Sequence, residues 1–288
     1  MKLVTVIAND QEKAGILLDD VVVPIECIND HYRLDFEVKM KPLIESDQLS
    51  ELARWLANKQ HIVTEIRGVL PLCDVTWGPL YRDPEKIWGI GLNYVDHAAD
   101  LNEVAPNTEP ASFMKPVTTI IGPGETIKLP PQSERTTGEA ELGIIIGKTC
   151  KDVEEHEAFD VIAGYTTIID MTAEDILEKN PRYLTRSKSF DTFFSFGPVF
   201  LTRDEVEDLH SLEVRTMHNG ELHRKNTIAH MTFSPEMLVS FHSKVMTLHP
   251  GDIISTGTPG AVHLQEGDIV GCEIDGFLPL TNPVKAAD

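Results

Sequence analysis

The stretch from residue 138 to residue 146 reads Gly138-Glu139-Ala140-Glu141-Leu142-Gly143-Ile144-Ile145-Ile146. The isoleucines in its second half favour a β-strand, because β-branched side chains fit a pleated sheet. Successive side chains of a strand point to opposite faces, so Glu139 and Glu141 share one face. The apolar residues at the even positions share the other face and can pack in a core. We therefore expect a strand with one buried face and one face that carries two neighbouring carboxylates.

The two carboxylates allow two interpretations. A solvated strand face is the simpler one, because paired acids are common on surfaces. Burial of Glu139 and Glu141 side by side would cost several kcal/mol unless a cation lay between them. Asp170 favours the second interpretation, because it ends the apolar run Val161–Ile169 and the next residues, from Thr172, resemble the start of a capped helix. An acid at such a junction reaches solvent poorly, and three oxygen ligands suit magnesium or manganese better than zinc.

The overall charge excludes two classes of partner. The chain has 25 Lys and Arg residues against 46 Asp and Glu residues, a formal net charge of −21. Such a surface repels nucleic acids and anionic lipid headgroups. A carboxylate substrate would also be repelled, so its site would need local positive charge from a metal or from lysines.

The cysteines and the hydropathy pattern bear on the compartment. The four cysteines are scattered without a CxxC pair, which is typical of free thiols in a reducing compartment. The stretch Met1–Asn9 lacks the features of a secretory leader, and apolar stretches stay short of the roughly 20 residues of a membrane helix. We expect a cytoplasmic protein.

The first 82 residues are predicted to form a small α+β domain. Strand patterns cover Lys2–Ala8, Ala14–Leu18 and Val21–Ile25, with turn residues between them. A helix is predicted around 49–56, with Ser46 or Asp47 as its N-cap. A Pro- and Gly-rich segment follows, so we place the domain boundary near Arg82, giving domains 1–82 and 83–288.

The second domain is predicted to be mostly β, which makes the chain an α+β protein. Short helices are expected after Asn93, after Thr172 and over Ser234–Val245. The predicted strands are Ile87–Leu92, Thr119–Ile121, Ala140–Gly147, Val161–Ile169, Pro198–Thr202, Leu212–His218, Asp252–Thr256 and Asp268–Ile274.

The expected helix after Asn93 contains a candidate general base. His97 and Asp100 are three residues apart and would share one helix face. A carboxylate beside an imidazole orients the ring and raises its basicity. Such pairs are also common as surface ion pairs, so the spacing alone does not decide between the two roles.

Taken together, these stretches resemble the fumarylacetoacetate hydrolase family, in the family's order, from Ile87 to about Val284. The resemblance implies a mixed β-sandwich roll that is usually dimeric and binds a divalent ion. It also implies C–C bond chemistry on 2-oxo acids that carry a second carbonyl. The first eighty residues resemble the small N-terminal domain of some bacterial members. The stretches that carry the resemblance are Gly91–Tyr94 with His97, Phe113–Pro116, Ile121–Gly124, Glu139–Leu142, Gly164-Tyr165, Asp170–Ala173, Lys188–Phe193, Gly197-Pro198, Asn219–Glu221 and Gly251–Pro259.

The resemblance also assigns roles to residues. It implies Glu139, Glu141 and Asp170 as ligands of Mg²⁺ or Mn²⁺, and His97 with Asp100 as a base dyad on a mobile lid. The remaining positions that match the family's site are those expected to contact the substrate or to supply positive charge to the reaction: Lys115, Lys188 and Thr258.

This chain departs from the family pattern after the metal acid. Glu174 stands where the family usually has arginine, and Leu177 stands where it usually has glutamine. An anion at the first position should disfavour a second negative group on the substrate by about 1–3 kcal/mol. Arg182 or Arg186 could compensate, and we include Arg186 among the expected substrate contacts.

The expected activity is metal-dependent hydrolysis of a C–C bond in 2,4-dioxo acids such as acylpyruvates. Two alternatives stay open. One is a decarboxylase or tautomerase of oxaloacetate-like acids, which would use the same metal without an attacking water. The other is a catalytically silent protein that binds a 2-oxo acid, which Glu174 and Leu177 suggest.

Overall fold

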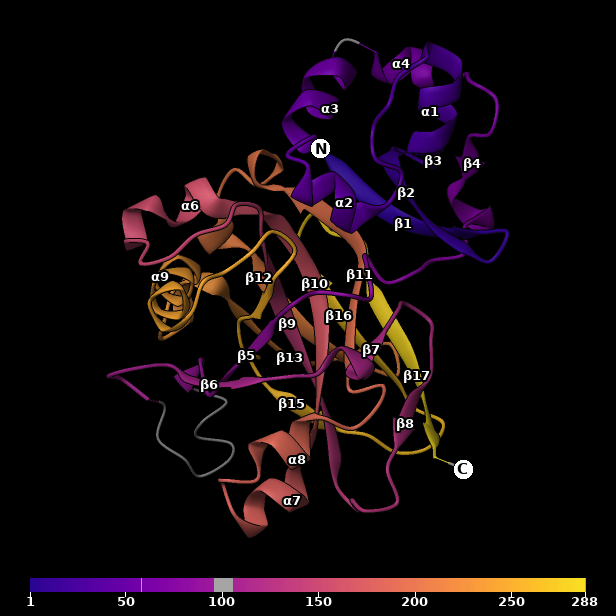
Figure 1. Ribbon diagram of the computed structural model, residues 1–288. Coiled ribbons are helices and arrows are strands. Elements are labelled where there is room, and N and C mark those ends of the chain that lie inside the picture. The colour runs from indigo at the N-terminus through magenta and orange to yellow at the C-terminus, as the bar shows by residue number, and fades with distance from the viewer. Residues whose placement is uncertain (58, 96–105, 288) are drawn as a thin grey trace.

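The computed structural model describes residues 1–57, 59–95 and 106–287 (Figure 1). Strands dominate it, and the described helices are short, which confirms the predicted α+β class with mostly β structure. The N-terminal unit stands at one end of the molecule, and α7 and α8 lie at the opposite end (Figure 1). None of the helices in the described ranges is long and apolar enough to cross a membrane.

The N-terminal unit consists of a strand meander with helices packed against it. Its strands are β1 (Lys2–Ala8), β2 (Gln11–Leu18), β3 (Val21–Pro24) and β4 (Leu70–Pro71). Its helices are α1 (Ile25–Tyr32), α2 (Met40–Glu45), α3 (Leu49–Leu56) and α4 (Gln60–Val63). Asn9 and Asp10 both have positive φ, 51° and 58°, which is the geometry of a tight hairpin turn.

The prediction for the cap of α3 is wrong. Gln48 occupies the N-cap position, in a helical conformation and without a side-chain hydrogen bond to the helix. Asp47 instead takes a positive φ of 58° in the turn before it. The helix is held by its buried face, on which Leu52 and Leu56 pack into the core shared with the main sheet. Tertiary packing therefore stabilises this helix without a cap.

The main sheet continues without a break from the N-terminal unit into the rest of the chain. Strand β1 pairs antiparallel with β11, opposing Leu3 to Phe200 and Val4 to Val199. The strand order is β4-β3-β2-β1-β11-β10-β9-β14-β5-β6, with β15 beside β9 and β7 beside β11. The bounds are β5 (Ile87–Gly91), β6 (Ala111–Met114), β7 (Ile120–Ile121), β9 (Thr136–Ile146), β10 (Ile162–Ala173), β11 (Phe194–Thr202), β14 (Ile253–Ser255) and β15 (Ala261–His263).

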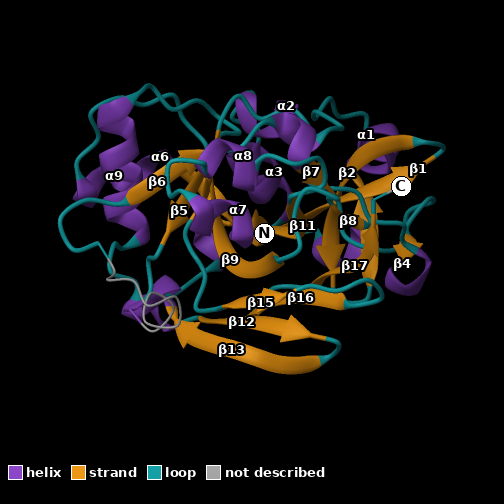
Figure 2. Ribbon diagram, turned by 90° about the horizontal axis from the view of Figure 1, so that it is seen from below, coloured by secondary structure: helices purple, strands orange, loops and turns teal. Residues whose placement is uncertain are grey.

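A second, five-stranded sheet has the order β13-β12-β16-β17-β8 and forms a separate layer (Figure 2). Its strands are β8 (Ile127–Leu129), β12 (Glu213–His218), β13 (Glu221–Thr227), β16 (Ile269–Ile274) and β17 (Leu280–Ala286). Side chains between the two sheets, including Leu142 and Ile144 of β9 and Val270 and Cys272 of β16, share one core. The two layers are the expected β-sandwich.

The remaining helices lie around the edges of the sheets. They are α6 (Ala158–Val161), α7 (Glu174–Lys179), α8 (Leu184–Lys188) and α9 (Pro235–Val245). Helix α9 lies where a helix was predicted, and Ser234 is its N-cap, with its hydroxyl accepting a hydrogen bond from the backbone N–H of Met237. Short 3₁₀ turns occur at Leu72–Asp74, Val117–Thr119, Glu155–Glu157, Arg203–Glu205, Leu209–Ser211 and Ile228–His230.

The predicted helix start at Thr172 is wrong. Strand β10 continues past Asp170 through Ala173, and α7 begins at Glu174. Thr172 and Ala173 pair with Thr137 and Thr136 of β9, so the sheet ladder satisfies their backbone groups. A local capping pattern is overridden here by a long-range strand pairing.

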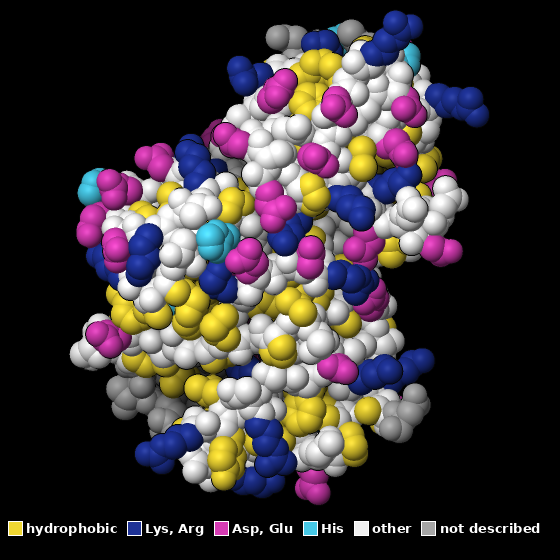
Figure 3. All heavy atoms as spheres, in the orientation of Figure 1, with side chains coloured by type: hydrophobic (Ala, Val, Ile, Leu, Met, Phe, Trp, Pro, Cys, Tyr) yellow, Lys and Arg dark blue, Asp and Glu magenta, His cyan; other side chains and the backbone are white. Residues whose placement is uncertain are grey.

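Surface charges are mixed in sign over the face drawn in Figure 3. Acidic and basic side chains alternate across the N-terminal unit at the top of this view. The four cysteines are free thiols, in agreement with the absence of a cysteine framework in the sequence.

Candidate metal centre and active site

The three predicted acids meet on one face of the β9–β10 ribbon. In the antiparallel register Asp170 lies directly opposite Glu139, and Glu141 follows two residues along β9, on the same face. One carboxylate oxygen from each of the three lies within 4.8 Å of the other two. Glu139, Glu141 and Asp170 are 8%, 1% and 0% exposed, which excludes a solvated strand face.

Neighbouring strands hold two of the acids in place. The Ser255 hydroxyl and the Gly257 backbone N–H donate to the same oxygen of Glu141, Oε2, at 2.5 and 2.8 Å. Gly257 has a φ of +95°, and a Cβ there would lie 2.8 Å from Cβ of Asn93, so the position requires glycine. The Thr172 hydroxyl donates to Oε1 of Glu139 at 2.9 Å. These donors fix one oxygen of each glutamate.

Two buried lysines neutralise part of the acid cluster. Lys188 Nζ lies 2.6 Å from Asp170 Oδ2 and 2.9 Å from Glu139 Oε2, and Lys115 Nζ lies 2.5 Å from Asp170 Oδ1. Lys188 also sits 4.7 Å above the Phe113 ring, a cation–π distance. The sequence predicted both lysines near the substrate, and the structure pairs them with the metal acids themselves.

The pKa values reflect this burial and pairing. Burial, followed by the charges of Asp170 and Glu139, raises the pKa of Glu141 to about 8. Burial alone would raise the pKa of Asp170, but Lys115 and Lys188 lower it below its ordinary value. Burial lowers the pKa of Lys115 to about 8, whereas Asp170 and Glu139 raise the pKa of Lys188 despite its burial.

The charge balance fits a divalent cation. Three carboxylates face two ammonium groups, so the buried cluster carries one negative charge in excess when all three acids are ionised, and the raised pKa of Glu141 reflects the cost of that charge. A divalent ion would reverse this excess to one positive charge, which a single carboxylate of a substrate could neutralise. Oxygen-only ligands with room for further oxygen donors suit a hard cation such as Mg²⁺ or Mn²⁺. The triad is therefore a metal-binding site by its geometry and its chemistry.

The other predicted site residues differ in where they lie. Thr258 is buried, and its hydroxyl exchanges hydrogen bonds with the backbone of Gly260 at 3.2 Å. Arg186 is exposed on α8, two residues before Lys188 and so on a different side of the helix. His97 and Asp100 lie outside the described residues.

The residues just before His97, Asn93 and Tyr94, are held by hydrogen bonds to neighbouring segments. Asn93, from which the sequence predicts a helix, bridges two loops. Its side-chain amide donates to the carbonyls of Phe233 and Thr256, and its side-chain oxygen accepts from the N–H of Phe233. Tyr94 forms an isolated bridge with Met231. The chain is thus anchored beside the strand that contributes Ser255.

The sequence did not reveal Ser255, Gly257 and Thr172 as supports of the acids. Their roles depend on β14 lying beside β9, with Ser255 opposite Gly143, and on the continuation of β10 to Ala173. A serine or threonine within a strand has no local signal for such a contact. The Gly257-Thr258-Pro259 turn after β14 was the one local feature that could have pointed to this region as part of the site.

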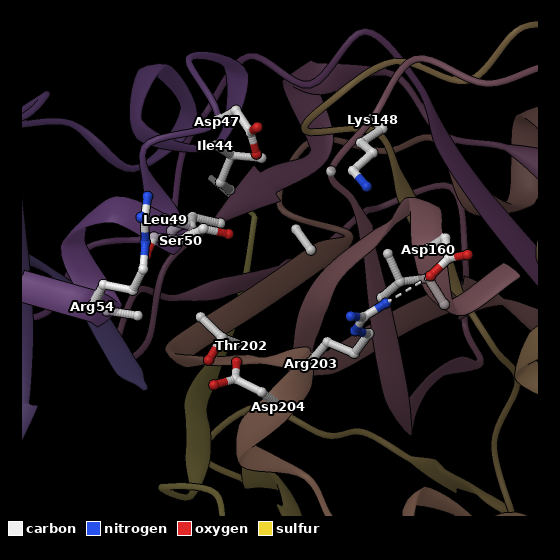
Figure 4. A pocket seen from close by; sticks show the side chains of 14 residues that line it. Ile44, Asp47, Leu49, Ser50, Arg54, Lys148, Asp160, Thr202, Arg203 and Asp204 are labelled. Atoms are coloured by element: carbon white, nitrogen blue, oxygen red, sulfur yellow. Dashed lines mark hydrogen bonds and ion pairs between the residues drawn. The ribbon is translucent and has the colours of Figure 1, made fainter. Parts of the chain in front are cut away.

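A separate hollow lies between α2–α3 and the main sheet, away from the triad (Figure 4). It has a volume of about 380 Å³ and is lined by Arg54 and Asp47 on one side and Lys148, Arg203 and Asp204 on the other. Arg203 is paired with Asp160 at 3.5 Å, and these polar residues are exposed. Among the described residues, the triad is the group that brings three buried acids together with two buried lysines, so we place the candidate active site there.

Comparison with known proteins shows which proteins this chain is similar to. The family model for the fumarylacetoacetate (FAA) hydrolase C-terminal domain matches residues 86–285. A mitochondrial oxaloacetate tautomerase of Xenopus laevis is 38% identical over 238 residues, covering 80% of this chain and 72% of the relative. An uncharacterized protein of Methanocaldococcus jannaschii is 44% identical over 203 residues, covering 70% of this chain and 84% of the relative.

Solved structures match over the whole length. A 5-carboxymethyl-2-hydroxymuconate delta-isomerase from Mycobacterium smegmatis has a TM-score of 0.77 and 31% identity, with 100% of both chains covered. A maleylpyruvate hydrolase from Sphingobium sp. SYK-6, in complex with manganese(II) ion and pyruvate, has a TM-score of 0.82 and 27% identity, again with 100% of both chains covered. The chemistry named for these proteins differs, while the substrates named are small organic acids.

Proposed function

The chain belongs to the fumarylacetoacetate hydrolase family, and on this basis we propose that it is a metal-dependent hydrolase that cleaves a C–C bond in 2,4-dioxo acids. The observation that carries the proposal is the buried triad of Glu139, Glu141 and Asp170 with two lysines beside it. A buried, partly neutralised acid cluster that accepts a divalent ion is suited to bind the oxygens of a 2-oxo acid. The structural likeness to a maleylpyruvate hydrolase that holds manganese and pyruvate supports the same reading.

The residues around the triad would position the metal ligands and stabilise negative charge on the substrate. A bound divalent ion supplies Lewis-acid chemistry at the 2-oxo group. Ser255 and Gly257 keep Glu141 oriented, and Thr172 keeps Glu139 oriented, so the ligand oxygens are held in place before substrate arrives. Lys188 and Lys115 supply positive charge where negative charge develops on the substrate oxygens.

We assign the proton transfer to His97. Its ring nitrogen would take a proton from water, with Asp100 orienting the ring, and the water oxygen would attack the carbonyl at C4. The bond between C3 and C4 then breaks, its electron pair stays on C3 as an enolate of the 2-oxo acid, and that carbon later takes up a proton. Thr258 and the exposed Arg186 are proposed to contact the substrate. Arg186 would place a positive charge at the entrance of the active site.

The test is an assay with Mn²⁺ or Mg²⁺ and a panel of acylpyruvates and oxaloacetate, in which enol absorbance and CO₂ release are followed. Loss of the enol with formation of two acids and no CO₂ supports hydrolysis. His97→Ala should lose hydrolysis and keep metal affinity. Full turnover in that variant would show that the dyad assignment is wrong.

A second candidate is tautomerisation or decarboxylation of oxaloacetate-like acids. It is favoured by the 38% identity with an oxaloacetate tautomerase. This chemistry uses the same metal site without an attacking water, so it should depend less on His97. CO₂ release, or enol–keto exchange without cleavage, in the same assay would favour it. Binding of a 2-oxo acid without any turnover would favour a silent binding protein.

We also propose that the protein acts as a homodimer in the cytoplasm. Members of its family usually pair, and the scattered free cysteines are suited to a reducing compartment. Light scattering coupled to size-exclusion chromatography checks the first point: a mass near twice 32.1 kDa is expected.

A further inference from the structure

The polar face of the β9–β10 ribbon extends beyond the metal acids. From the pair Glu139–Asp170, the register runs to Thr137–Thr172 and Thr136–Ala173. The next pair is Arg135–Glu174, and the Glu174 N–H donates to the Arg135 carbonyl at 2.8 Å. Every second pair lies on the same face. Arg135 precedes β9 and Glu174 begins α7, so this pair lies at the end of the ribbon, four residues along each chain from Glu139 and Asp170.

A third strand adds a histidine to this face. In β15, Ala261 lies opposite Glu139 and His263 lies opposite Thr137. Directly paired residues of an antiparallel sheet project to the same side, so His263 is a diagonal neighbour of Glu139, at a Cβ separation of about 7–8 Å. Thr137 and Thr172 are buried, whereas His263 is exposed. His263 is thus the accessible member of this row.

This side is also where the site opens. In the opposite direction along the same face, Ile145 of β9 and Ile168 of β10 are buried in the core. Towards β15 and α7, the Arg135 side chain is 49% exposed. A substrate whose 2-oxo end lies at the triad would therefore extend its tail past His263 towards Arg135 and Glu174.

The charges at the end of this path are unfavourable for an anion. Arg135 is the cation there, and two of its nitrogens already face acids: Nε lies 2.9 Å from Glu174 Oε2 and Nη1 lies 3.0 Å from Glu178 Oε1. The Glu174 side chain is only 10% exposed, while that of Glu178 is 58% exposed. One cation between two acids leaves a net negative charge. Glu174 is the acid that is better shielded from solvent, so its charge acts more strongly on a tail at this end of the path.

We propose that Glu174, with Arg135 and His263, forms the tail subsite, and that it selects 2-oxo acids whose tail carries no second carboxylate. This inference rests on the proposed function, because it takes the triad as the place of the 2-oxo end. It agrees with the charge balance at the triad, where a divalent ion leaves one positive charge for one carboxylate. Glu174 excludes the second carboxylate by repulsion, and His263 can hydrogen-bond an uncharged polar tail.

Two unreactive acids of equal length make the test. Calorimetry with Mn²⁺ present compares 2-oxohexanoate, which ends in a methyl group, with 2-oxoadipate, which ends in a carboxylate. The wild type should bind 2-oxohexanoate at least tenfold more tightly. Glu174→Gln should shrink this ratio about tenfold, and Arg135→Gln should widen it, because the Glu174 charge then loses its partner. Glu51→Gln, an exposed acid on α3, removes the same charge elsewhere and should leave the ratio within twofold.

The binding ratio is expected to change in opposite directions in Glu174→Gln and Arg135→Gln. This separates a charge effect from a loss of folding, because unfolding would weaken the binding of 2-oxohexanoate and 2-oxoadipate alike. Equal or tighter binding of 2-oxoadipate by the wild type, or an unchanged ratio in Glu174→Gln, overturns the inference while leaving the proposed function standing. If neither acid binds with Mn²⁺ present, the proposed function is wrong and the inference falls with it.

Discussion

Two clusters of buried charge in this molecule differ in how their charges balance. Asp252, at the start of β14, is 0% exposed and accepts from Lys86 Nζ, from the Lys86 N–H and from the His249 N–H at 2.9, 2.9 and 2.7 Å. One acid meets one ammonium group and two backbone donors, so its charge is satisfied within the chain. The triad has three acids and two ammonium groups, so one negative charge stays unbalanced when all three acids are ionised.

The difference teaches how to separate structural from functional burial of charge. A closed ion pair such as Asp252–Lys86 requires nothing from outside and joins two segments of the fold. An open cluster such as the triad is stable only because lysines offset most of its charge, and it gains most from an added cation. Three predictions test the two clusters, and a fourth tests a buried histidine outside them, in order from the largest expected effect to the smallest.

Glu141→Gln should reduce metal-dependent turnover at least 1,000-fold, about 4 kcal/mol of transition-state stabilisation. The amide keeps the shape and the hydrogen bonding but removes one anionic ligand, so the fold should persist. Steady-state assays with Mn²⁺ and circular dichroism measure the two effects, with Glu51→Gln as a control for net charge. Unchanged turnover would remove the triad from the chemistry.

Asp252→Ala should lower the free energy of unfolding by about 2–4 kcal/mol, because Lys86 and two backbone donors lose their acceptor. Urea denaturation measures this, and Mn²⁺ affinity should stay within twofold. Asp83→Ala is the matched control: Asp83 pairs with Lys41 but is 76% exposed, so its loss should cost under about 0.5 kcal/mol. A large drop in Mn²⁺ affinity for Asp252→Ala would contradict the division into two kinds of cluster.

Ser255→Ala should weaken Mn²⁺ binding about tenfold without touching a ligand, because Glu141 then loses one of the two donors that orient it. Calorimetric titration with Mn²⁺ measures the change. Ser240→Ala, which removes a buried hydroxyl bonded to the Val153 carbonyl, should leave the affinity unchanged. Equal losses in both variants would point to general destabilisation.

The smallest effect is expected at His242, a buried titratable residue outside both clusters, on the pH dependence of stability. Burial lowers its pKa in the fold, although the Leu238 carbonyl accepts a hydrogen bond from Nδ1. The unfolded chain then binds the proton more readily, so stability is greatest above the unfolded pKa of about 6.5 and is lost as pH falls below it. His242→Gln should show a shallower decline of melting temperature between pH 7 and pH 5 than the wild type. An identical slope in both proteins would show that His242 does not contribute to it.

The sequence determined the parts of this protein that depend on local pattern. Alternation along β9 predicted that Glu139 and Glu141 share a face, and the apolar run before Asp170 predicted a buried strand leading to the third acid. The hydrophobic spacing of α3 likewise predicted that helix, and a helix was also expected over the range of α9. These features need only a few neighbouring residues, because strand and helix periods fix which side chains face the core.

The tertiary structure decided which strands lie side by side, and with them the partners of the acids. Lys115, Lys188 and Ser255 reach the triad from three other elements. Arg135, and neither Arg182 nor Arg186, is the described cation paired with Glu174. The reason is that an ion pair between residues 39 positions apart depends on strand register, which long-range pairing and core packing set together. No local pattern around Arg135 or Glu174 carries that information.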